Sequence, residues 1–384
     1  MTDWPVKSLG EVCEVVNGAT PDTKVKEYWG GSHAWITPAE MGNLDTPFLS
    51  MSRRTLSDKG LASCSATLVP PNTVIVSSRA PIGHLVINQV PMATNQGCKS
   101  LITRDGLDFN FLYYYLKANV ELLDSLGTGT TFKELSGAQL KTVNIPVPPF
   151  EEQKRIVALL DDATARVAEL TACYEHARTH ANNLFTSALR EALEVNPGWP
   201  IKTIGDLMTV QNGYAFDSQY FSPSGKIGLI RIRDLKSGVG TETNFVGPYD
   251  DEYVVTSGDY LIGMDGEFRC YEWKGAPALL NQRVCRLRDF GEMLDARFLF
   301  FGINKFLKEI EDITGYTTVK HLSSKSILAI EMPVPPLDEQ KRIVGRLDSI
   351  KAMTSEMVAT YNAKLAAAKN LRQSILEAAF AGEL

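Results

Sequence analysis

The stretch Asn144-Ile-Pro-Val-Pro-Pro-Phe-Glu-Glu-Gln-Lys-Arg-Ile-Val157 occurs twice in this chain, the second time as Glu331-Met-Pro-Val-Pro-Pro-Leu-Asp-Glu-Gln-Lys-Arg-Ile-Val344. The offset between the two copies is 187 positions throughout. Consecutive prolines end a strand or a helix, and acidic residues directly after them favour the start of a new helix. Each copy therefore predicts a joint at which a folded domain ends and a long helix begins.

The duplication extends beyond this stretch. Trp4-Pro-Val-Lys-Ser-Leu-Gly-Glu11 returns as Trp199-Pro-Ile-Lys-Thr-Ile-Gly-Asp206, and Asn17-Gly18 returns as Asn212-Gly213. Residues at these framework positions match, whereas the residues between them diverge strongly. We therefore expect two copies of one large unit, in which one scaffold carries two different surfaces.

The segments 1–149 and 198–336 have the composition of compact mixed domains, with many Gly, Pro, Asn and Thr residues. Short apolar runs bounded by turn residues, at 73–77 and 259–263, predict strands. Helical spacing of apolar residues at 109–123 and 297–310 predicts one helix in each copy. The expected fold class is therefore α/β (α+β) globular domains, present as two pseudo-repeats.

The segments 150–197 and 337–384 follow the two joints, and each is expected to form one long helix. At 1.5 Å per residue each helix is about 65 Å long, and a lone solvated helix of that length is unstable. Apolar or small residues recur in alternating steps of four and three, the pattern of a coiled coil. Because a folded domain lies between the helices in the sequence, we expect them to form two long antiparallel coiled-coil helices that separate the domains. The predicted contact positions are Ile156, Leu160, Ala163, Val167, Leu170, Tyr174, Ala177, Ala181, Leu184 and Ala188, and then Ile343, Leu347, Ile350, Thr354, Met357, Tyr361, Lys364, Ala368, Leu371 and Ile375.

Composition argues against several classes of protein. The 384 residues carry a net charge of −6, which disfavours a simple nucleic-acid binder unless basic surfaces are local or a partner supplies them. The six cysteines are scattered without a Cys-x-x-Cys pair, which fits free thiols in a reducing cytoplasm. A secretory signal is not evident, and no run approaches the twenty or so apolar residues that span a bilayer. We expect a cytoplasmic protein with no membrane partner.

Motifs of catalysis and of metal binding are missing. The chain has no phosphate-binding Gly-x-x-x-x-Gly-Lys-Ser/Thr, no Gly-x-Gly-x-x-Gly after a strand, and no Gly-x-Ser-x-Gly. His176 and His180 stand four residues apart on a predicted helix, but no third metal ligand accompanies them. We therefore predict a non-catalytic protein without a metal site.

A globular domain, then Pro-x-Pro-Pro with Glu-Gln, then a long helix, all present twice, resembles the specificity subunit of type I restriction-modification systems. The resemblance covers essentially the whole chain. The first domain also resembles the family at Asn17-Gly-Ala-Thr-Pro21, Tyr28-Trp-Gly-Gly-Ser-His-Ala-Trp-Ile-Thr37, Arg79-Ala-Pro-Ile-Gly83 and Gly127-Thr-Gly-Thr-Thr-Phe-Lys133. The second domain departs from it by lacking the Tyr-Trp-Gly-Gly and Arg-Ala-Pro-Ile-Gly motifs.

The resemblance implies a protein that recognises DNA and takes part in DNA methylation and defence against foreign DNA. Residues 1–149 and 198–336 would be target recognition domains, each contacting one half of an interrupted double-stranded DNA site. Helices 150–197 and 337–384 would set the spacing and dock two methylation subunits, which restriction subunits join. S-adenosylmethionine, ATP and Mg would belong to those partner subunits, and none would be bound by this chain. Two linked domains on one face of the duplex would place the half-sites about 10 bp apart.

Contacts to bases require Arg, Lys, Asn or Gln on exposed loops. The duplicated loops Gly129–Lys133 and Gly315–Lys320 are better suited to phosphate, because glycine opens the backbone and hydroxyls or a lysine can meet the anion. Asn95-Gln96 recurs as Asn281-Gln282, which favours a shared structural turn. The repeated Glu-Gln-Lys-Arg at each joint is interpreted as an anchor between domain and helix, with partner docking as the alternative. The candidate DNA-contacting residues are Arg53, Arg54, Arg79, Lys99, Thr130, Thr131 and Lys133 in the first copy, and Arg231, Arg233, Arg269, Arg283, Thr317, Thr318 and Lys320 in the second.

Two other functions stay open at this point. The first is a structural adaptor that carries two protein-binding domains on a coiled-coil rod and has no role on DNA, which the acidic net charge slightly favours. The second is an enzyme with an unrecognised site, which the missing reactive motifs disfavour.

Overall fold

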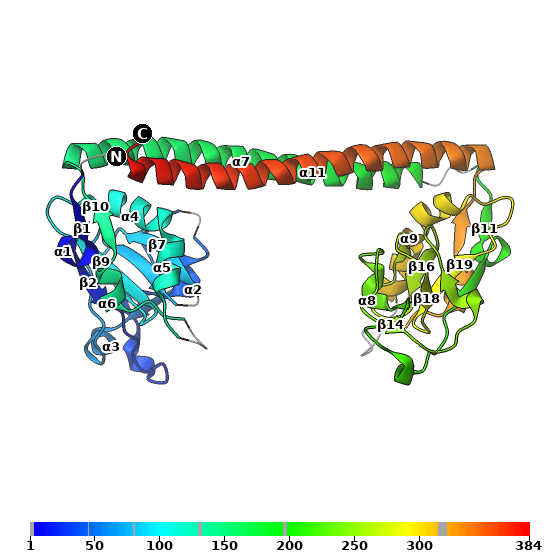
Figure 1. Cartoon of the computed structure of the whole chain (residues 1–384), viewed down its shortest axis with the longest axis horizontal. Coiled ribbons are helices and arrows are strands. Elements are labelled where there is room, and N and C mark those ends of the chain that lie inside the picture. Colours follow the sequence, from blue (N-terminus) through cyan, green and yellow to red (C-terminus); the bar gives the residue numbers. More distant parts are fainter. Residues whose placement is uncertain (1–3, 45, 80, 130–132, 195–197, 314–320) are drawn as a thin grey trace. The chain divides into compact units, whose positions relative to one another are not determined.

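The computed structural model describes residues 4–44, 46–79, 81–129, 133–194, 198–313 and 321–384. The chain forms two compact units (Figure 1). Unit 1 consists of Met1–His176 and Tyr361–Leu384, and unit 2 consists of Ala177–Thr360. Each unit thus combines one globular domain with parts of two long helices, and each is described by itself below.

Unit 1 is built on a five-stranded sheet and a three-stranded sheet. The larger sheet has the order β2 (Cys13–Asn17), β9 (Cys98–Thr103), β6 (Val74–Ser78), β7 (Ile82–Asn88) and β4 (Phe48–Leu49). The smaller has the order β5 (Arg54–Leu56), β3 (Trp29–Ile36) and β8 (Met92–Thr94), and β1 (Val6–Ser8) pairs with β10 (Asn144–Pro146). All five residues of β6 are buried, as expected for a strand covered on both faces. The helices of this domain are α1 (Leu9–Val12), α2 (Pro38–Met41), α3 (Asp58–Ala62), α4 (Phe109–Ala118), α5 (Val120–Leu126) and α6 (Gly137–Lys141).

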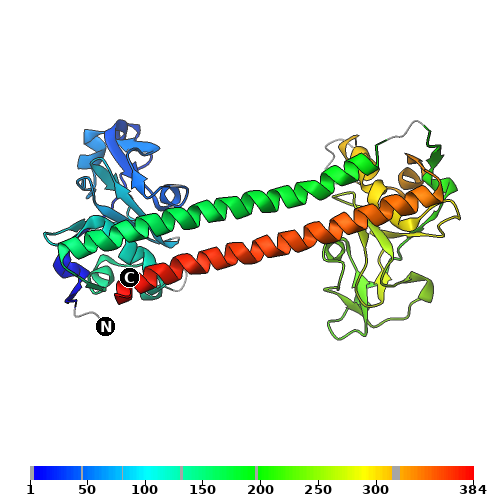
Figure 2. The same ribbon diagram turned by 90° about the horizontal axis from the view of Figure 1, so that it is seen from above.

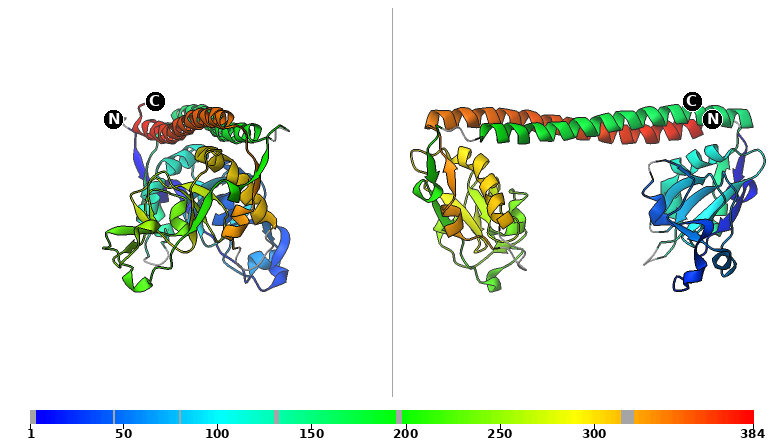
Figure 3. Two further views of the ribbon diagram at one scale, coloured as in Figure 1. Left: turned by 90° about the vertical axis from the view of Figure 1, so that its right-hand side faces the viewer. Right: turned by 180° about the vertical axis from the view of Figure 1, so that it is seen from behind.

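Unit 2 repeats this plan with shorter strands (Figures 1 and 3). One sheet has the order β12 (Thr209–Asn212), β19 (Val284–Arg288), β16 (Tyr260–Gly263) and β17 (Cys270–Glu272). The other has the order β14 (Asn244–Phe245), β13 (Ile227–Ile230), β18 (Ala278–Leu280) and β15 (Val254–Val255). The strands β11 (Ile201–Thr203) and β20 (Glu331–Pro333) form a pair that corresponds to β1 and β10. The helices of this domain are α8 (Ile232–Leu235), α9 (Ala296–Ile313) and α10 (Ser324–Leu328).

The long helices are α7 (Phe150–Ala192) and α11 (Leu337–Ala381), and they run antiparallel within each unit (Figure 2). In unit 1 the start of α7 meets the end of α11, because Arg155 donates a 2.8 Å hydrogen bond to the carbonyl oxygen of Leu384. In unit 2 the end of α7 meets the start of α11, because the Arg346 guanidinium lies 3.1 Å from the Glu191 carboxylate. The predicted antiparallel pairing of two long helices is therefore confirmed.

Some of the predicted contact positions on these helices are wrong. Leu170, Leu184 and Leu371 are 45%, 44% and 47% exposed. A straight helix turns once per 3.6 residues, so a heptad pattern drifts by about 20° per heptad away from a fixed partner. Each helix also buries residues against the domain of its unit, and Val157 and Phe380 pack into the core of unit 1.

The glutamine of the repeated Glu-Gln-Lys-Arg holds the domain to the helix by the same contacts in both units. In unit 1 the fully buried Gln153 accepts a hydrogen bond from the N–H of Asp108 and donates to the carbonyl oxygens of Gly106 and Pro148, each at 2.8 Å. In unit 2 the fully buried Gln340 makes three equivalent bonds at 2.8 Å, to Asp295, Met293 and Pro335. The anchoring interpretation is confirmed.

The helices and strands predicted from short stretches of sequence are present, but their boundaries differ from those predicted. The helix predicted at 109–123 is two helices that meet at Asn119, which ends α4 and precedes α5. The strands predicted at 73–77 and 259–263 are β6 and β16. The domain boundaries at 149, 197 and 336 stay predictions. Among the described helices, none is both long and apolar enough to cross a membrane.

Candidate nucleic-acid interface

The same backbone hydrogen bond occurs in both units, at the end of an inner strand of the five-stranded sheet in unit 1 and just after an inner strand of a four-stranded sheet in unit 2. Leu135 donates its N–H to the carbonyl oxygen of Ser78 at 2.8 Å in unit 1, and Leu322 donates to that of Met264 at 2.7 Å in unit 2. Ser78 ends β6, and Met264 follows β16. The residues next to this bond are therefore equivalent between the units, and their side chains can be compared directly.

In unit 1 this place holds a cluster of three candidate cations. Arg79 follows β6, and its guanidinium lies 3.7 Å from the carboxylate of Glu134. The Lys99 ammonium lies 3.8 Å from the same carboxylate, but its side chain is almost enclosed, and burial lowers its pKa. Lys133 is exposed and pairs with Asp124 at 2.6 Å. Arg79 and Lys133 can therefore meet an anion in solution, whereas Lys99 is better placed to balance Glu134.

In unit 2 the equivalent place carries different chemistry. Asp265 takes the position of Arg79, and His321 takes that of Glu134. The Asp265 carboxylate lies 2.8 Å from Nδ1 of His321 and 3.0 Å from the guanidinium of Arg283. An acid thus replaces a base at one position, and Arg283 supplies the exposed positive charge from another. One backbone frame presents two different sets of hydrogen-bonding groups.

Arg53 and Arg54 lie at the start of the smaller sheet of unit 1. Arg54 is the first residue of β5, and its guanidinium stacks over the Trp29 ring at 3.6 Å and lies 5.3 Å from the Trp35 ring. Stacking fixes the plane of a guanidinium and leaves its edge N–H groups free for bidentate contacts with a base. Arg53 is exposed, and its backbone N–H donates to Glu40 at 2.7 Å. Arg54 has the geometry best suited to a specific contact.

The other second-copy candidates are spread over unit 2. Arg231 lies 5.0 Å over the Phe221 ring, and Arg233 pairs with Glu242 at 3.1 Å. Arg269 is exposed immediately before β17. Each of these three arginines has partners different from those of Arg283, and their contact with DNA stays a prediction. Thr130, Thr131, Thr317, Thr318 and Lys320 lie outside the described residues.

The repeated Asn-Gln pair belongs to the backbone structure that the two units share. Asn95 accepts a 2.6 Å hydrogen bond from the N–H of Gly97, which closes a tight turn. A Cβ at Gly18 would stand 2.0 Å from the carbonyl oxygen of Asn95, and one at Gly213 would stand 2.1 Å from that of Asn281. The two turns and the two glycines therefore recur together because each glycine lets two backbone segments touch.

Sequence reasoning missed the role of Arg286. This arginine is 7% exposed, and it donates to Gln211, to Asp259 and to two backbone carbonyls. It therefore stabilises unit 2 from inside. No local pattern marks it, because its partners lie between 27 and 75 residues away.

Comparisons with known proteins indicate one family, and the matches together cover the whole chain. A family model described as type I restriction modification DNA specificity domain matches residues 1–173 and 196–367. The MjaIX specificity subunit of Methanocaldococcus jannaschii, from a type I restriction enzyme, is 28% identical over 413 residues, which cover 100% of this chain and 94% of that protein. The EcoBI specificity subunit of Escherichia coli is 34% identical over 205 residues, which cover 53% of this chain and 43% of that protein.

Solved structures share the fold. A chain from work on complex assembly and conformational transition of the type I R-M system has a TM-score of 0.81 at 20% identity, covering 99% of this chain and 98% of its own length. The HsdS subunit from Thermoanaerobacter tengcongensis has a TM-score of 0.61 at 21% identity, and the match covers 99% of this chain and 97% of that subunit. At these identities the likeness supports the architecture of the chain.

Proposed function

Because this chain belongs to the family of type I restriction-modification DNA specificity domains, we propose that it recognises an interrupted double-stranded DNA site, one half with each unit. Specificity subunits are non-catalytic, so recognition is the work of this chain. Each half would be contacted by loops at the sheet ends of one unit.

One observation carries the proposal. The same backbone frame holds Arg79 and Glu134 in unit 1 but Asp265 and His321 in unit 2. A frame that repeats while its exposed donors and acceptors change suits two surfaces that recognise different base sequences. A structural adaptor whose two protein-binding domains held the same partner would have no need for that difference.

We assign two kinds of contact to these surfaces. Arg54 and Arg283 are exposed arginines held by neighbours, and such arginines suit bidentate contacts to guanine. Arg79 and Lys133 suit contacts to phosphate, which position a protein without specifying sequence. Because the chain carries a net charge of −6, much of the phosphate binding would come from partner subunits.

We further propose that the exposed faces of α7 and α11 dock two methylation subunits, which restriction subunits join. Leu159, Leu170 and Leu371 expose apolar surface along these helices, at 42%, 45% and 47%. S-adenosylmethionine, ATP and Mg would be held by those partners and not by this chain. The assembly would work in the cytoplasm, where DNA is available.

The test is to express the chain with its methylation subunit in a host without other DNA methylation and to sequence the methylated genome. We expect an interrupted, two-part motif. Replacing 1–149 by the corresponding segment of another family member should change one half of the motif and leave the other half unchanged. Replacing 198–336 is the matched control and should change only the other half.

Insertion of four residues at corresponding points of both long helices tests the spacing. The insertion adds about 6 Å, which is close to two base pairs of 3.4 Å each. We expect a longer unread gap between unchanged halves. An uninterrupted motif, or a gap that ignores the insertion, would contradict the proposal, and well-expressed protein that produces no motif at all would favour the adaptor.

A further inference from the structure

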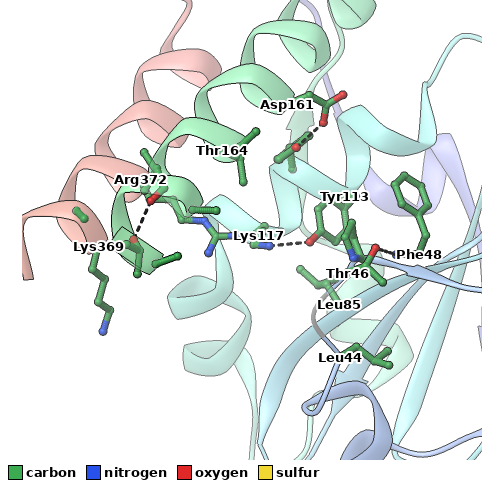
Figure 4. A pocket seen from close by; sticks show the side chains of 18 of the residues that line it. Leu44, Thr46, Phe48, Leu85, Tyr113, Lys117, Asp161, Thr164, Lys369 and Arg372 are labelled. Carbon is green, nitrogen blue, oxygen red and sulfur yellow. Dashed lines mark hydrogen bonds between the residues drawn. The ribbon is translucent and has the colours of Figure 1, made fainter. Parts of the chain in front are cut away.

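Unit 1 contains a cavity that the recognition of DNA does not use. It has a volume of about 810 Å³ and lies between the globular domain and the two long helices (Figure 4). That volume falls within the range of small-molecule sites, about 300–1,000 Å³. About half of the residues that line it are apolar, among them Leu85, Val167, Ala168 and Leu365. A cavity of this size and lining could hold the apolar body of a small ligand.

Two cations face this cavity without an acid between them. Lys117 on α4 donates a 2.7 Å hydrogen bond to the phenolic oxygen of Tyr113, which is a neutral partner. Figure 4 shows Arg372 reaching from α11 toward Lys117. Burial, and then the nearby charge of Arg372, lower the pKa of Lys117 to about 8. Within the described part of the chain, neither Lys117 nor Arg372 forms an ion pair with a carboxylate.

The acids that line the cavity are engaged or exposed. Asp161 accepts a 2.6 Å hydrogen bond from the hydroxyl of Tyr114. Glu175 lies on the exposed side of α7, and Lys369 adds another positive charge at the rim. Enclosing a cation without a counter-charge costs free energy, and a protein usually avoids it by pairing the cation or by neutralising it. An anion inside the cavity would remove that cost.

Unit 2 provides an internal control, because the repeat places an equivalent residue at each position. At the 187-residue offset, Lys117 corresponds to Asn304 and Arg372 corresponds to Phe185. Asn304 is satisfied within its own unit, since it accepts from the N–H of Cys270 at 2.7 Å and donates to its carbonyl oxygen at 3.3 Å. Phe185 packs against Phe301 with ring centroids 6.2 Å apart. The scaffold therefore does not require two cations here.

We propose that the cavity of unit 1 binds a small organic anion, with the acidic head group between Lys117 and Arg372 and the apolar body against the helices. The head group would be a carboxylate, sulfonate or phosphate, each of which accepts charge-assisted hydrogen bonds from both cations. The apolar wall selects against inorganic ions, which gain nothing from it. This inference does not rest on the recognition of DNA, so either can fail alone.

The test uses the 384-residue chain and anilinonaphthalene sulfonate, a fluorescent anion with an aromatic body, as the probe. We expect saturable binding with one site per chain. Octanoate should displace the probe at concentrations about tenfold or more below those at which octanol does, because the alcohol has the same chain without the charge. The double variant Lys117→Met with Arg372→Met should bind the probe about tenfold or more weakly.

Lys351→Met is the matched control. Lys351 is a half-buried lysine of unit 2 whose pKa burial also lowers, and it lies 5.5 Å from the Phe300 ring. Its removal should leave binding of the probe unchanged. Absence of a saturable site, equal displacement by octanol and octanoate, or equal loss in the control and the double variant would each overturn the proposal. If the double variant fails to fold, the comparison of octanoate with octanol on the unmodified chain decides the question.

Discussion

Substitution of Gln153 by leucine should destabilise unit 1 far more than the same substitution of Gln373, an exposed glutamine on α11 in the same unit. Leucine has a similar volume, so it fills the space without admitting water, but it forms no hydrogen bond. The change therefore isolates the polar function of the side chain. The question is how much of the attachment between domain and helix depends on this one amide.

The size of the effect follows from the three bonds of Gln153. Its removal leaves the N–H of Asp108 and the carbonyl oxygens of Gly106 and Pro148 without their partner. Each buried group left unsatisfied costs about 1–3 kcal/mol. Because water can reach some of the three, we expect a loss of about 3–5 kcal/mol. That is a large part of the roughly 5–15 kcal/mol by which a domain is stable.

Hydrogen exchange read by mass spectrometry measures this loss in each unit separately, which a single unfolding curve of a two-unit chain does not. Gln153→Leu should lower protection around Asp108 and spare unit 2, and Gln340→Leu should do the reverse around Asp295. Gln373→Leu is the control, since Gln373 is exposed and its loss should cost no more than about 0.5 kcal/mol. If Gln153→Leu costs as little as this control, the anchor interpretation is refuted.

Two further predictions concern charged residues of unit 1. Arg54→Ala should relax recognition in one half of the DNA site by about 1–3 kcal/mol at one base pair, whereas Arg53→Ala should leave that half unchanged, as methylome sequencing of each variant would show. Because the pKa of Lys117 in the folded chain, about 8, lies below that of the unfolded chain, the unfolded state binds more protons between pH 8 and pH 10.5. Urea unfolding should therefore show stability rising over this window in the unmodified chain but less so in Lys117→Met. A rise of equal size in both would show that the other groups facing the cavity (Tyr113, Tyr114, Asp161, Glu175, Lys369 and Arg372) cause it.

The joints and the paired helices could be predicted because their signals are local and repeated. Prolines, acidic residues and a buried glutamine stand together in fourteen residues, and the same residues recur 187 positions later. The predicted contacts at Leu170 and Leu184 are wrong, and both residues are exposed. A seven-residue pattern does not determine how far a helix stays in contact with its partner. Local patterns locate elements, but they do not show which face of a long helix is covered.

Neither the surface chemistry nor the buried Arg286 could be predicted, because the interacting residues are distant in the sequence. His321 and Asp265 are 56 residues apart, and Gln211 and Arg286 are 75 apart. Lys117 on α4 and Arg372 near the end of α11 face one cavity only because α11 returns to the first domain. Long-range neighbours of this kind leave no pattern in a single sequence.

The division between frame and surface has a physical basis in the type of partner. Gln153, Gln340, Gly18 and Gly213 act on backbone atoms, which every sequence supplies, so these residues can stay the same while their neighbours change. Arg79 and its equivalent Asp265 act on side chains near the surface, and exchanging such residues usually costs no more than about 0.5 kcal/mol. A chain built in this way can therefore acquire a new recognition surface in one unit without weakening the attachment of that unit to its helices.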